Sequence, residues 1–169
     1  MTRGTIFLAI FLGVIQQPTQ LPKTEAYALV LNDAKSWHLE QSLFAGRQTY
    51  LCNRLLTPYR QGLLRAYRFE YQQDIATALL DTLRQQGIID STCSPLNQAG
   101  EWNEGHDRLL LSITELEERS DGDLYCQVLV RAPYRTDRGR RGYFVLAEYH
   151  LTQQDSKIVL VERQVLIIT

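Results

Sequence analysis

The amino-acid sequence predicts an α+β fold, in which one antiparallel β-meander of about four or more strands carries one main helix. Two observations support this prediction. Apolar and polar side chains alternate along several segments of the last third of the chain, and an earlier segment has apolar residues at helical spacing. The 169 residues are enough for one ordinary domain.

The N-terminal segment has the order of charge, apolar run and small residues that is typical of a secretory signal peptide. Arg3 precedes an apolar run over residues 6–15, which would be about 15 Å long as a helix, half of a bilayer's hydrocarbon core. Residues 26–28 form the pattern Ala-Tyr-Ala, after which a signal peptidase would cut. The sequence therefore predicts a signal peptide and processing region over residues 1–28 and a single α+β domain over residues 29–169. An earlier cut and a retained anchor stay open as alternatives.

The main helix is predicted over residues 74–86. Asp74 is a good N-cap residue, and Ile75 and Leu79 begin an apolar face at helical spacing. Gly87 favours the left-handed backbone conformation with which helices commonly end. Upstream, residues 63–71 alternate in part and are rich in aromatic groups, which favours a strand.

The strands of the meander are predicted in the last third of the chain. Pro133 is expected to end the second of them, because proline has no N–H for a β-ladder. Turn residues lie at 120–123 and 152–156, and short connections between consecutive strands favour antiparallel neighbours. The predicted strands cover residues 109–114, 124–131, 143–151 and 158–168.

Both faces of the last two predicted strands carry large apolar side chains. One face can pack against the helix. For the other face the sequence leaves two interpretations: either the N-terminal strands cover it, or it binds a ligand or partner.

Three cysteines, Cys52, Cys93 and Cys126, are candidates for one disulfide, because two of them can pair in an oxidising compartment. The sequence does not choose among the three pairings, and three partly buried thiols are the alternative. No C-x-x-C or Cys/His spacing indicates a zinc site, and no metal or cofactor is predicted.

The sequence carries no recognisable catalytic motif. It has no Gly-rich phosphate loop, no G-x-S-x-G turn and no H-E-x-x-H pair. His150 is expected on the face of a strand beside Glu148, where a structural role is more typical than a catalytic one. Residues 101–107 combine carboxylates with a histidine, but such a segment is more typical of a solvated loop than of an acid–base site. We therefore expect no enzymatic activity.

The binding hypothesis rests on an arginine-rich segment, which we expect to form a loop over residues 133–142. A guanidinium group grips carboxylate or phosphate with two hydrogen bonds, so such a loop suits an acidic protein partner or anionic lipid headgroups. A solubilising hairpin tip is the alternative. A net charge of −1 gives no general attraction for nucleic acid. The candidate binding residues are Arg131, Tyr134, Arg135, Arg138, Arg140 and Arg141.

The helix ending at Gly87 is followed by the apolar segments 107–113, 126–130 and 144–149. This order resembles that of the periplasmic auxiliary lipoproteins of ABC-type envelope transport and of the lipopolysaccharide-assembly lipoprotein. The resemblance covers roughly residues 63–152 and rests on the pattern of elements. It implies a helix followed by long antiparallel strands, and a role that assists transport without catalysis. The chain has no cysteine near its N-terminal apolar run and ends in a predicted strand instead of a helix, so lipid attachment is not implied here.

We therefore expect an exported, periplasmic or envelope-associated accessory protein that binds a partner protein without catalysis. One alternative is a small-ligand-binding protein or enzyme with a pocket between helix and sheet. Another is a nucleic-acid binder that uses the arginine-rich segment. A membrane surface is a further candidate contact, and the sequence does not predict the oligomeric state.

Overall fold

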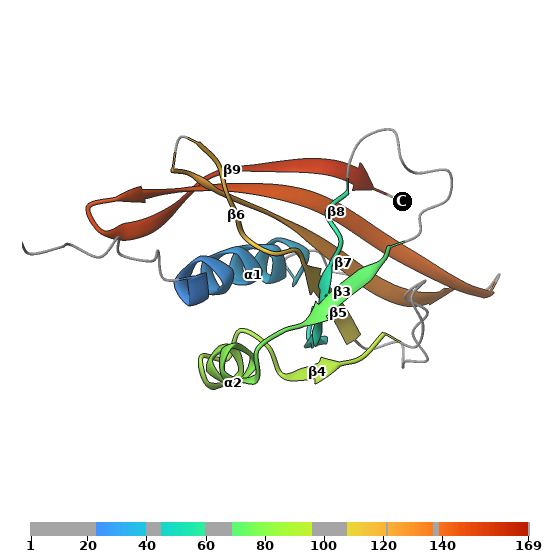
Figure 1. Ribbon diagram of the computed structural model, residues 1–169. Helices are drawn as coiled ribbons and strands as arrows, with labels where there is room; N and C mark the ends of the chain where they lie inside the picture. Colours follow the sequence, from blue (N-terminus) through green and yellow to red (C-terminus); the bar gives the residue numbers. More distant parts are fainter. Residues whose placement is uncertain are drawn as a thin grey trace, which may run out of the picture.

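The computed structural model describes residues 23–39, 45–59, 69–95, 108–120, 122–136 and 139–168. Within these ranges the chain is α+β, as predicted, with two helices and a strand-rich sheet (Figure 1). The helices are α1 (Lys23–Leu39) and α2 (Thr77–Gln85). The strands are β1 (Gln48–Cys52), β2 (Arg54–Leu56), β3 (Tyr71–Asp74), β4 (Ser91–Cys93), β5 (Arg108–Ile113), β6 (Glu117–Glu118), β7 (Leu124–Thr136), β8 (Gly139–Gln154) and β9 (Lys157–Ile168).

The main sheet has the strand order β4-β1-β5-β7-β8-β9, with β6 paired to β7. The predicted antiparallel run of β5, β7, β8 and β9 is confirmed. However, β1 pairs in parallel with both β4 and β5, so the prediction of a purely antiparallel meander is wrong and the sheet is mixed. Parallel neighbours are joined by long crossovers, and here α2 lies in the connection from β1 to β4.

The hairpin of β7 and β8 is longer than predicted. Strand β7 continues through Pro133, which pairs with Gly142, so the predicted loop over residues 133–142 is wrong. The described pairing of β5 with β7 reaches only as far as Arg131. Beyond that point β7 is an edge strand among the described residues, and edge strands tolerate a residue without an N–H. At the other end of β8, Asp155 and Ser156 make a tight turn with positive φ angles of 49° and 65°, as a type I′ hairpin turn requires.

Both helices pack on the same face of the sheet, which we call the inner face; Figure 1 shows α1 lying along the long strands. Residues of α1 and α2 share one apolar core with the inner-face side chains of β5, β7 and β8. Core residues from α1 include Val30 and Leu31, and those from α2 are Leu80 and Leu83. The predicted single helix on the sheet is thus joined by a second, longer one.

Helix α2 begins later than predicted. Its N-cap is Ala76, which makes no side-chain capping bond. Asp74 is instead the last residue of β3, where its carboxylate lies 3.5 Å from the Nε of Arg54, so it is not available as a cap. The predicted end is confirmed, because Gly87 has a φ of 69° and the N–H of Ile88 donates to the carbonyl of Leu83 at 3.0 Å.

Helix α1 was not predicted, and it includes the Ala-Tyr-Ala pattern. Ala26 is fully buried and Tyr27 is nearly so. The N–H of Leu116 donates to the Tyr27 hydroxyl at 3.0 Å, and burial raises the pKa of Tyr27 to about 12. Farther along the helix, Asp33 forms an ion pair at 2.6 Å with Arg163 of β9. No helix in the described part of the chain is long and apolar enough to cross a membrane.

On the opposite face of the sheet, which we call the outer face, the described residues form a cover at one end. The two-stranded sheet of β2 and β3 packs there, and Leu56, Phe69 and Tyr71 bury Leu129 of β7 and Leu146 of β8. Phe69 and Tyr71 come from the segment predicted as a strand over residues 63–71, but only its last residue lies in β3, and residues 60–68 are outside the described ranges.

Strand β9 forms one edge of the main sheet. Its pairing with β8 shifts register twice, once between Leu146 and Ala147 and once between His150 and Leu151, which marks two bulges. Several of its apolar side chains are exposed, with Val161 and Ile168 at 52% and 60% of their full exposure.

Candidate functional site

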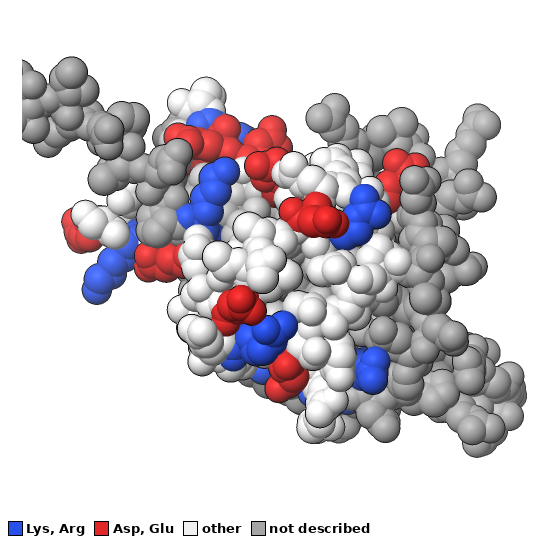
Figure 2. Space-filling view, turned by 60° about the horizontal axis from the view of Figure 1, so that its bottom comes forward, with Lys and Arg blue, Asp and Glu red and all other residues white. Residues whose placement is uncertain are grey.

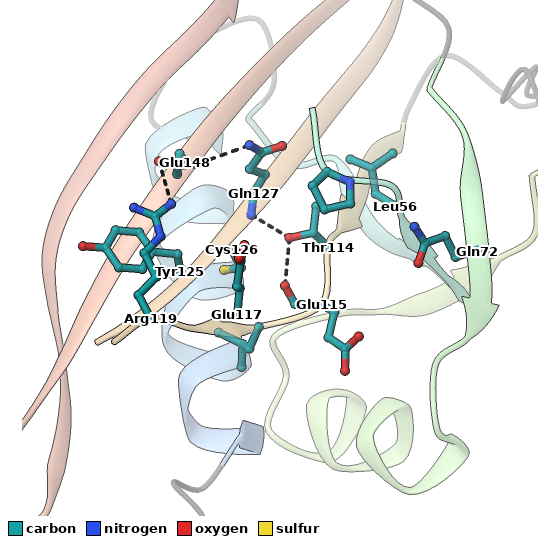
Figure 3. A pocket seen from close by; sticks show the side chains of 12 residues that line it. Leu56, Gln72, Thr114, Glu115, Glu117, Arg119, Tyr125, Cys126, Gln127 and Glu148 are labelled. Carbon is teal, nitrogen blue, oxygen red and sulfur yellow. Dashed lines mark hydrogen bonds and ion pairs between the residues drawn. The ribbon is translucent and has the colours of Figure 1, made fainter. Parts of the chain in front are cut away.

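A groove lies on the part of the outer face that β2 and β3 leave open. It consists of two adjoining hollows of about 390 and 190 Å³, which share Arg119, Tyr125 and Glu148. We call the two together the outer groove. The larger hollow is lined by Leu56, Pro58, Gln72, Thr114, Glu115, Leu116, Glu117, Arg119, Tyr125, Cys126, Gln127 and Glu148 (Figure 3). The smaller hollow adds His150, Glu162 and Gln164.

Gln127 is the centre of the groove floor. Its side-chain Oε1 accepts the N–H of Tyr59 at 2.7 Å, and its Nε2 donates to the Tyr59 carbonyl at 3.0 Å and to Glu148 at 3.2 Å. Its backbone N–H donates to the Thr114 hydroxyl at 2.9 Å. Gln127 is buried, so these bonds satisfy a polar side chain that would otherwise be costly in the interior. They also attach the segment after β2 to the sheet.

Arg119, Tyr125 and His150 form a stack beside Gln127. The Arg119 guanidinium carbon lies 3.5 Å from the centroid of the Tyr125 ring, and the His150 ring stacks on Tyr125 at 4.6 Å with an interplanar angle of 6°. Arg119 also lies 3.9 Å from Glu148, and a dashed line marks this ion pair in Figure 3. Because the cation, the phenol ring and the imidazole support one another, this wall of the groove is held in one arrangement.

Asp123 forms a hydrogen bond with the imidazole of His150. The Nε2 of His150 lies 2.5 Å from the Asp123 carboxylate. Hydrogen bonds from Thr152 and His150 lower the pKa of Asp123 below its usual value, so the carboxylate is charged at neutral pH. His150 contributes to the wall of the groove in this arrangement.

Among the described residues that line the outer groove, acidic side chains outnumber basic ones. Glu115, Glu117, Glu148 and Glu162 line it, and Arg119 is the one lysine or arginine in this described lining. Figure 2 shows one face of the molecule, on which the described acidic and basic residues are interspersed. The chain as a whole has a net charge of only −1, so the acidity of the groove is a local property. Such a surface attracts cationic groups.

The structure describes the side-chain surroundings of one of the arginines that the sequence grouped as candidate binding residues. Arg131 is packed at the covered end of the outer face, 5.0 Å from the centroid of the Phe69 ring, and burial lowers the pKa of its guanidinium. Along the β7–β8 hairpin, Tyr134 is the register partner of Arg141, and Arg135 is that of Arg140. Arg138 lies outside the described residues, as do residues 101–107. Binding by the hairpin arginines stays a prediction.

The three cysteines are buried thiols on two different faces of the sheet. Cys126 belongs to the inner-face core, and burial raises its pKa strongly. Cys52 belongs to the outer-face cluster, and burial raises its pKa to about 11. In the ladder of β1 and β4, Cys52 is the register partner of Cys93.

The sequence reasoning missed the outer groove, although one signal for it was present. On the outer face of β7 and β8 the side chains are apolar at Leu129 and Leu146 but polar at Gln127 and Glu148. A change from apolar to polar along one face of a strand marks the point where the cover of that face ends. The residues from β6 and its flanking segments gave no comparable signal, because their place beside β7 depends on pairing.

No group of three or more His, Cys, Asp or Glu residues suited to a metal ion occurs among the described residues. Comparisons of the chain with protein-family models, with curated proteins and with solved structures found no match.

Proposed function

We propose that this protein is an exported, non-catalytic accessory protein that binds a basic segment of a partner protein in the outer groove. The observation that carries the proposal is the groove itself, which is open, prearranged and locally acidic. Its polar side chains already hold one another in place, so a partner would meet a surface that needs little reordering. Preorganised surfaces bind with a smaller entropic cost.

The shape of the groove favours an extended segment. The larger hollow begins at Leu56 and Pro58 beside β2, and the smaller one reaches Glu162 and Gln164 on β9, so the groove crosses β7, β8 and β9. A lysine or arginine in such a segment would find carboxylates at both ends of its path.

Export remains part of the proposal and rests on the charge and apolar run of the N-terminal segment. Ala26 and Tyr27 are core residues of α1, so a cut after Ala28 would remove part of the core. We propose that any cut falls before Lys23, and that the mature chain keeps α1 whole. N-terminal sequencing of the protein from fractionated cells tests both points, and a mature chain beginning at Leu29 contradicts the second.

The groove is tested by removing three of its carboxylates, of which Glu115 lies 4.0 Å from the Nζ of Lys23. A triple variant, Glu115→Gln, Glu117→Gln and Glu162→Gln, keeps the size of each side chain and removes three negative charges. We expect affinity purification of the tagged variant from the envelope fraction to recover the partner at least tenfold less well than the native protein does, because a few carboxylate contacts in a partly desolvated groove account for that much affinity.

The matched control removes the same charge elsewhere. Glu25→Gln, Asp81→Asn and Asp155→Asn replace exposed acids on α1, on α2 and at the β8–β9 turn. Equal recovery of the partner by the groove variant and by the native protein would contradict binding in the outer groove. An equal loss in both triple variants would show that net charge, and not the groove, governs recovery.

Small-ligand binding is a second candidate, because about 390 Å³ lies in the range of ligand pockets. It differs from the expected pocket between helix and sheet, since the groove lies on the face opposite the helices. Mass spectrometry of the protein purified under native conditions separates the candidates: a bound small molecule that the groove variant loses favours this one.

A further inference from the structure

The register of β1 and β4 places two of the three cysteines side by side. These strands run parallel, and their paired residues are Tyr50 with Ser91, Leu51 with Thr92 and Cys52 with Cys93. The pairing continues past the cysteines, because the N–H of Asn53 donates to the Cys93 carbonyl at 2.8 Å. Register partners in neighbouring strands direct their side chains to the same face of a sheet.

We propose that Cys52 and Cys93 form a disulfide that joins β1 to β4 when the chain folds in the presence of a disulfide donor. The proposal rests on the proposed export, which would bring the chain to an oxidising compartment. It resolves a choice that the sequence leaves open among three pairings.

The strand spacing permits this bridge. Neighbouring strands lie about 4.7–4.9 Å apart, and disulfides join residues whose Cα atoms are about 4.4–6.8 Å apart. Cys52 belongs to the outer-face cluster with Tyr71, and its register partner Cys93 is buried as well. The two sulfur atoms therefore share one environment on the outer face.

The same geometry excludes the other two pairings. Cys126 is on β7, and β5 lies between β7 and β1 in the sheet order. Two strand spacings amount to about 9–10 Å, which exceeds the distance of about 4.4–6.8 Å between the Cα atoms that a disulfide joins. Cys126 also points into the inner-face core, whereas Cys52 belongs to the outer-face cluster.

Formation of the disulfide from two thiols requires an oxidant. This oxidant is a dithiol oxidoreductase in its disulfide form or oxidised glutathione. A thiolate of one cysteine attacks the donor disulfide and forms a mixed disulfide, which releases one donor thiol. The second thiolate then attacks the protein sulfur and releases the other donor thiol. Two electrons pass from the protein to the donor, and the two thiol protons go to solvent or to the donor thiolates.

Burial determines when the bridge can form. Cys52 is fully buried and burial raises its pKa to about 11, so the folded protein offers almost no accessible thiolate at neutral pH. We therefore infer that the bridge forms during folding, before β1 and β4 are covered. Oxidant added to the folded, reduced protein should react at least tenfold more slowly than oxidant present during refolding.

Tryptic mapping tests the pairing directly, because the three cysteines fall in three different peptides, residues 48–54, 85–108 and 120–131. The full-length chain is refolded with reduced and oxidised glutathione, quenched by alkylation and digested without reduction. We expect peptide 48–54 linked to peptide 85–108, and Cys126 alkylated once the chain is unfolded. Recovery of both Cys52 and Cys93 as alkylated thiols, or a link to Cys126, would overturn the proposal.

Two variants and a stability measurement complete the test. Cys93→Ser should abolish the link, and Cys126→Ser should keep it. Reduction should lower the thermal midpoint by about 5–10 °C in the native chain and in Cys126→Ser, because the bridge closes a loop of about 40 residues, and should change nothing in Cys93→Ser. Equal midpoints with and without reductant in the linked native chain would remove the stabilising role of the bridge.

Cell fractionation distinguishes failure of this inference from failure of the proposed function. Protein found in the envelope fraction with both cysteines as thiols overturns the bridge and leaves export intact. Protein confined to the cytoplasm overturns the proposed export, while the refolding experiment still decides whether Cys52 and Cys93 pair.

Discussion

Alternate residues of the same strands form the two faces of β7 and β8, yet the side chains on the two faces have different surroundings. On the inner face, Val128 and Tyr149 are buried against α1. On the outer face, Gln127 and Glu148 lie in an open groove. Within the described ranges, two helices cover the inner face, whereas β2 and β3 cover one end of the outer face.

This difference shows what alternation decides and what it leaves undecided. The period of two assigns each side chain to a face, because successive residues of a strand point in opposite directions. Whether that face is buried depends on distant segments that pack on it. Of the two interpretations open for the second face, the structure confirms cover by N-terminal strands at one end and leaves a groove at the other.

The largest expected effect comes from breaking the inner face. Leu151→Ala removes a fully buried side chain of β8, and we expect a loss of about 2–5 kcal/mol in the free energy of unfolding, through lost apolar burial and the cavity left behind. Urea denaturation followed by circular dichroism measures it. Gln164→Ala, at an exposed outer-face position, is the control and should change stability by less than about 0.5 kcal/mol. Similar losses in both variants would contradict the difference between the faces.

A smaller effect is expected at the centre of the outer groove. Gln127→Ala leaves the N–H and carbonyl of Tyr59 without their partner, which should cost about 1–3 kcal/mol of unfolding free energy. Gln127→Glu keeps an acceptor for the N–H but loses the donor and places a second carboxylate beside Glu148. We expect the glutamate variant to regain stability as pH falls toward 4, and the alanine variant not to. Urea denaturation at pH 7 and pH 4.5, each compared with the native protein, measures this difference. If the loss of unfolding free energy is independent of pH in both variants, repulsion between the two carboxylates is excluded.

The contact of α1 with the segment before β6 is smaller again. Tyr27→Phe keeps the ring in the core but removes the hydroxyl that accepts the N–H of Leu116. We expect a loss of about 1 kcal/mol in unfolding free energy, measured by urea denaturation, and faster exchange of the Leu116 amide hydrogen. An unchanged exchange rate would show that this hydrogen bond does not hold the segment.

The pH dependence of stability tests the burial of His38 on the inner face. It is fully buried, its Nδ1 donates to the carbonyl of Ala34 at 2.7 Å, and burial lowers its pKa below the usual 6.5. Asp33 and Arg163 are the charged groups that act on it, with opposite signs. The unfolded chain therefore binds a proton more readily than the folded one, so the stability from neutral His38 is complete above pH 6.5 and is lost as pH falls below it. Urea midpoints between pH 7.5 and 5 should fall less steeply in His38→Gln than in the native protein. Parallel curves for the two would contradict the assignment.

Local sequence patterns predicted the elements that depend on local forces. Alternation located β5, β7, β8 and β9, and Gly87 located the end of α2. Pairing of β1 with β4 and β5 was not predictable, since the residues of a short apolar strand do not specify which strand it pairs with. Helix α1 was missed because its apolar residues are not confined to one clear stripe and its Ala-Tyr-Ala pattern suggested processing. Of the proposed site, only the polar positions on β7 and β8 were visible in the sequence.

The bulges of β9 have a consequence for the behaviour of the chain at high concentration. A long edge strand with exposed valine and isoleucine side chains offers a template on which other chains can add and aggregate. Two bulges interrupt the regular spacing of its hydrogen-bonding groups, so an incoming strand cannot pair along the full length of the edge. The irregular register thus protects this edge from pairing with other chains, and deleting Val161, the extra β9 residue at one of the two bulges, would favour aggregation.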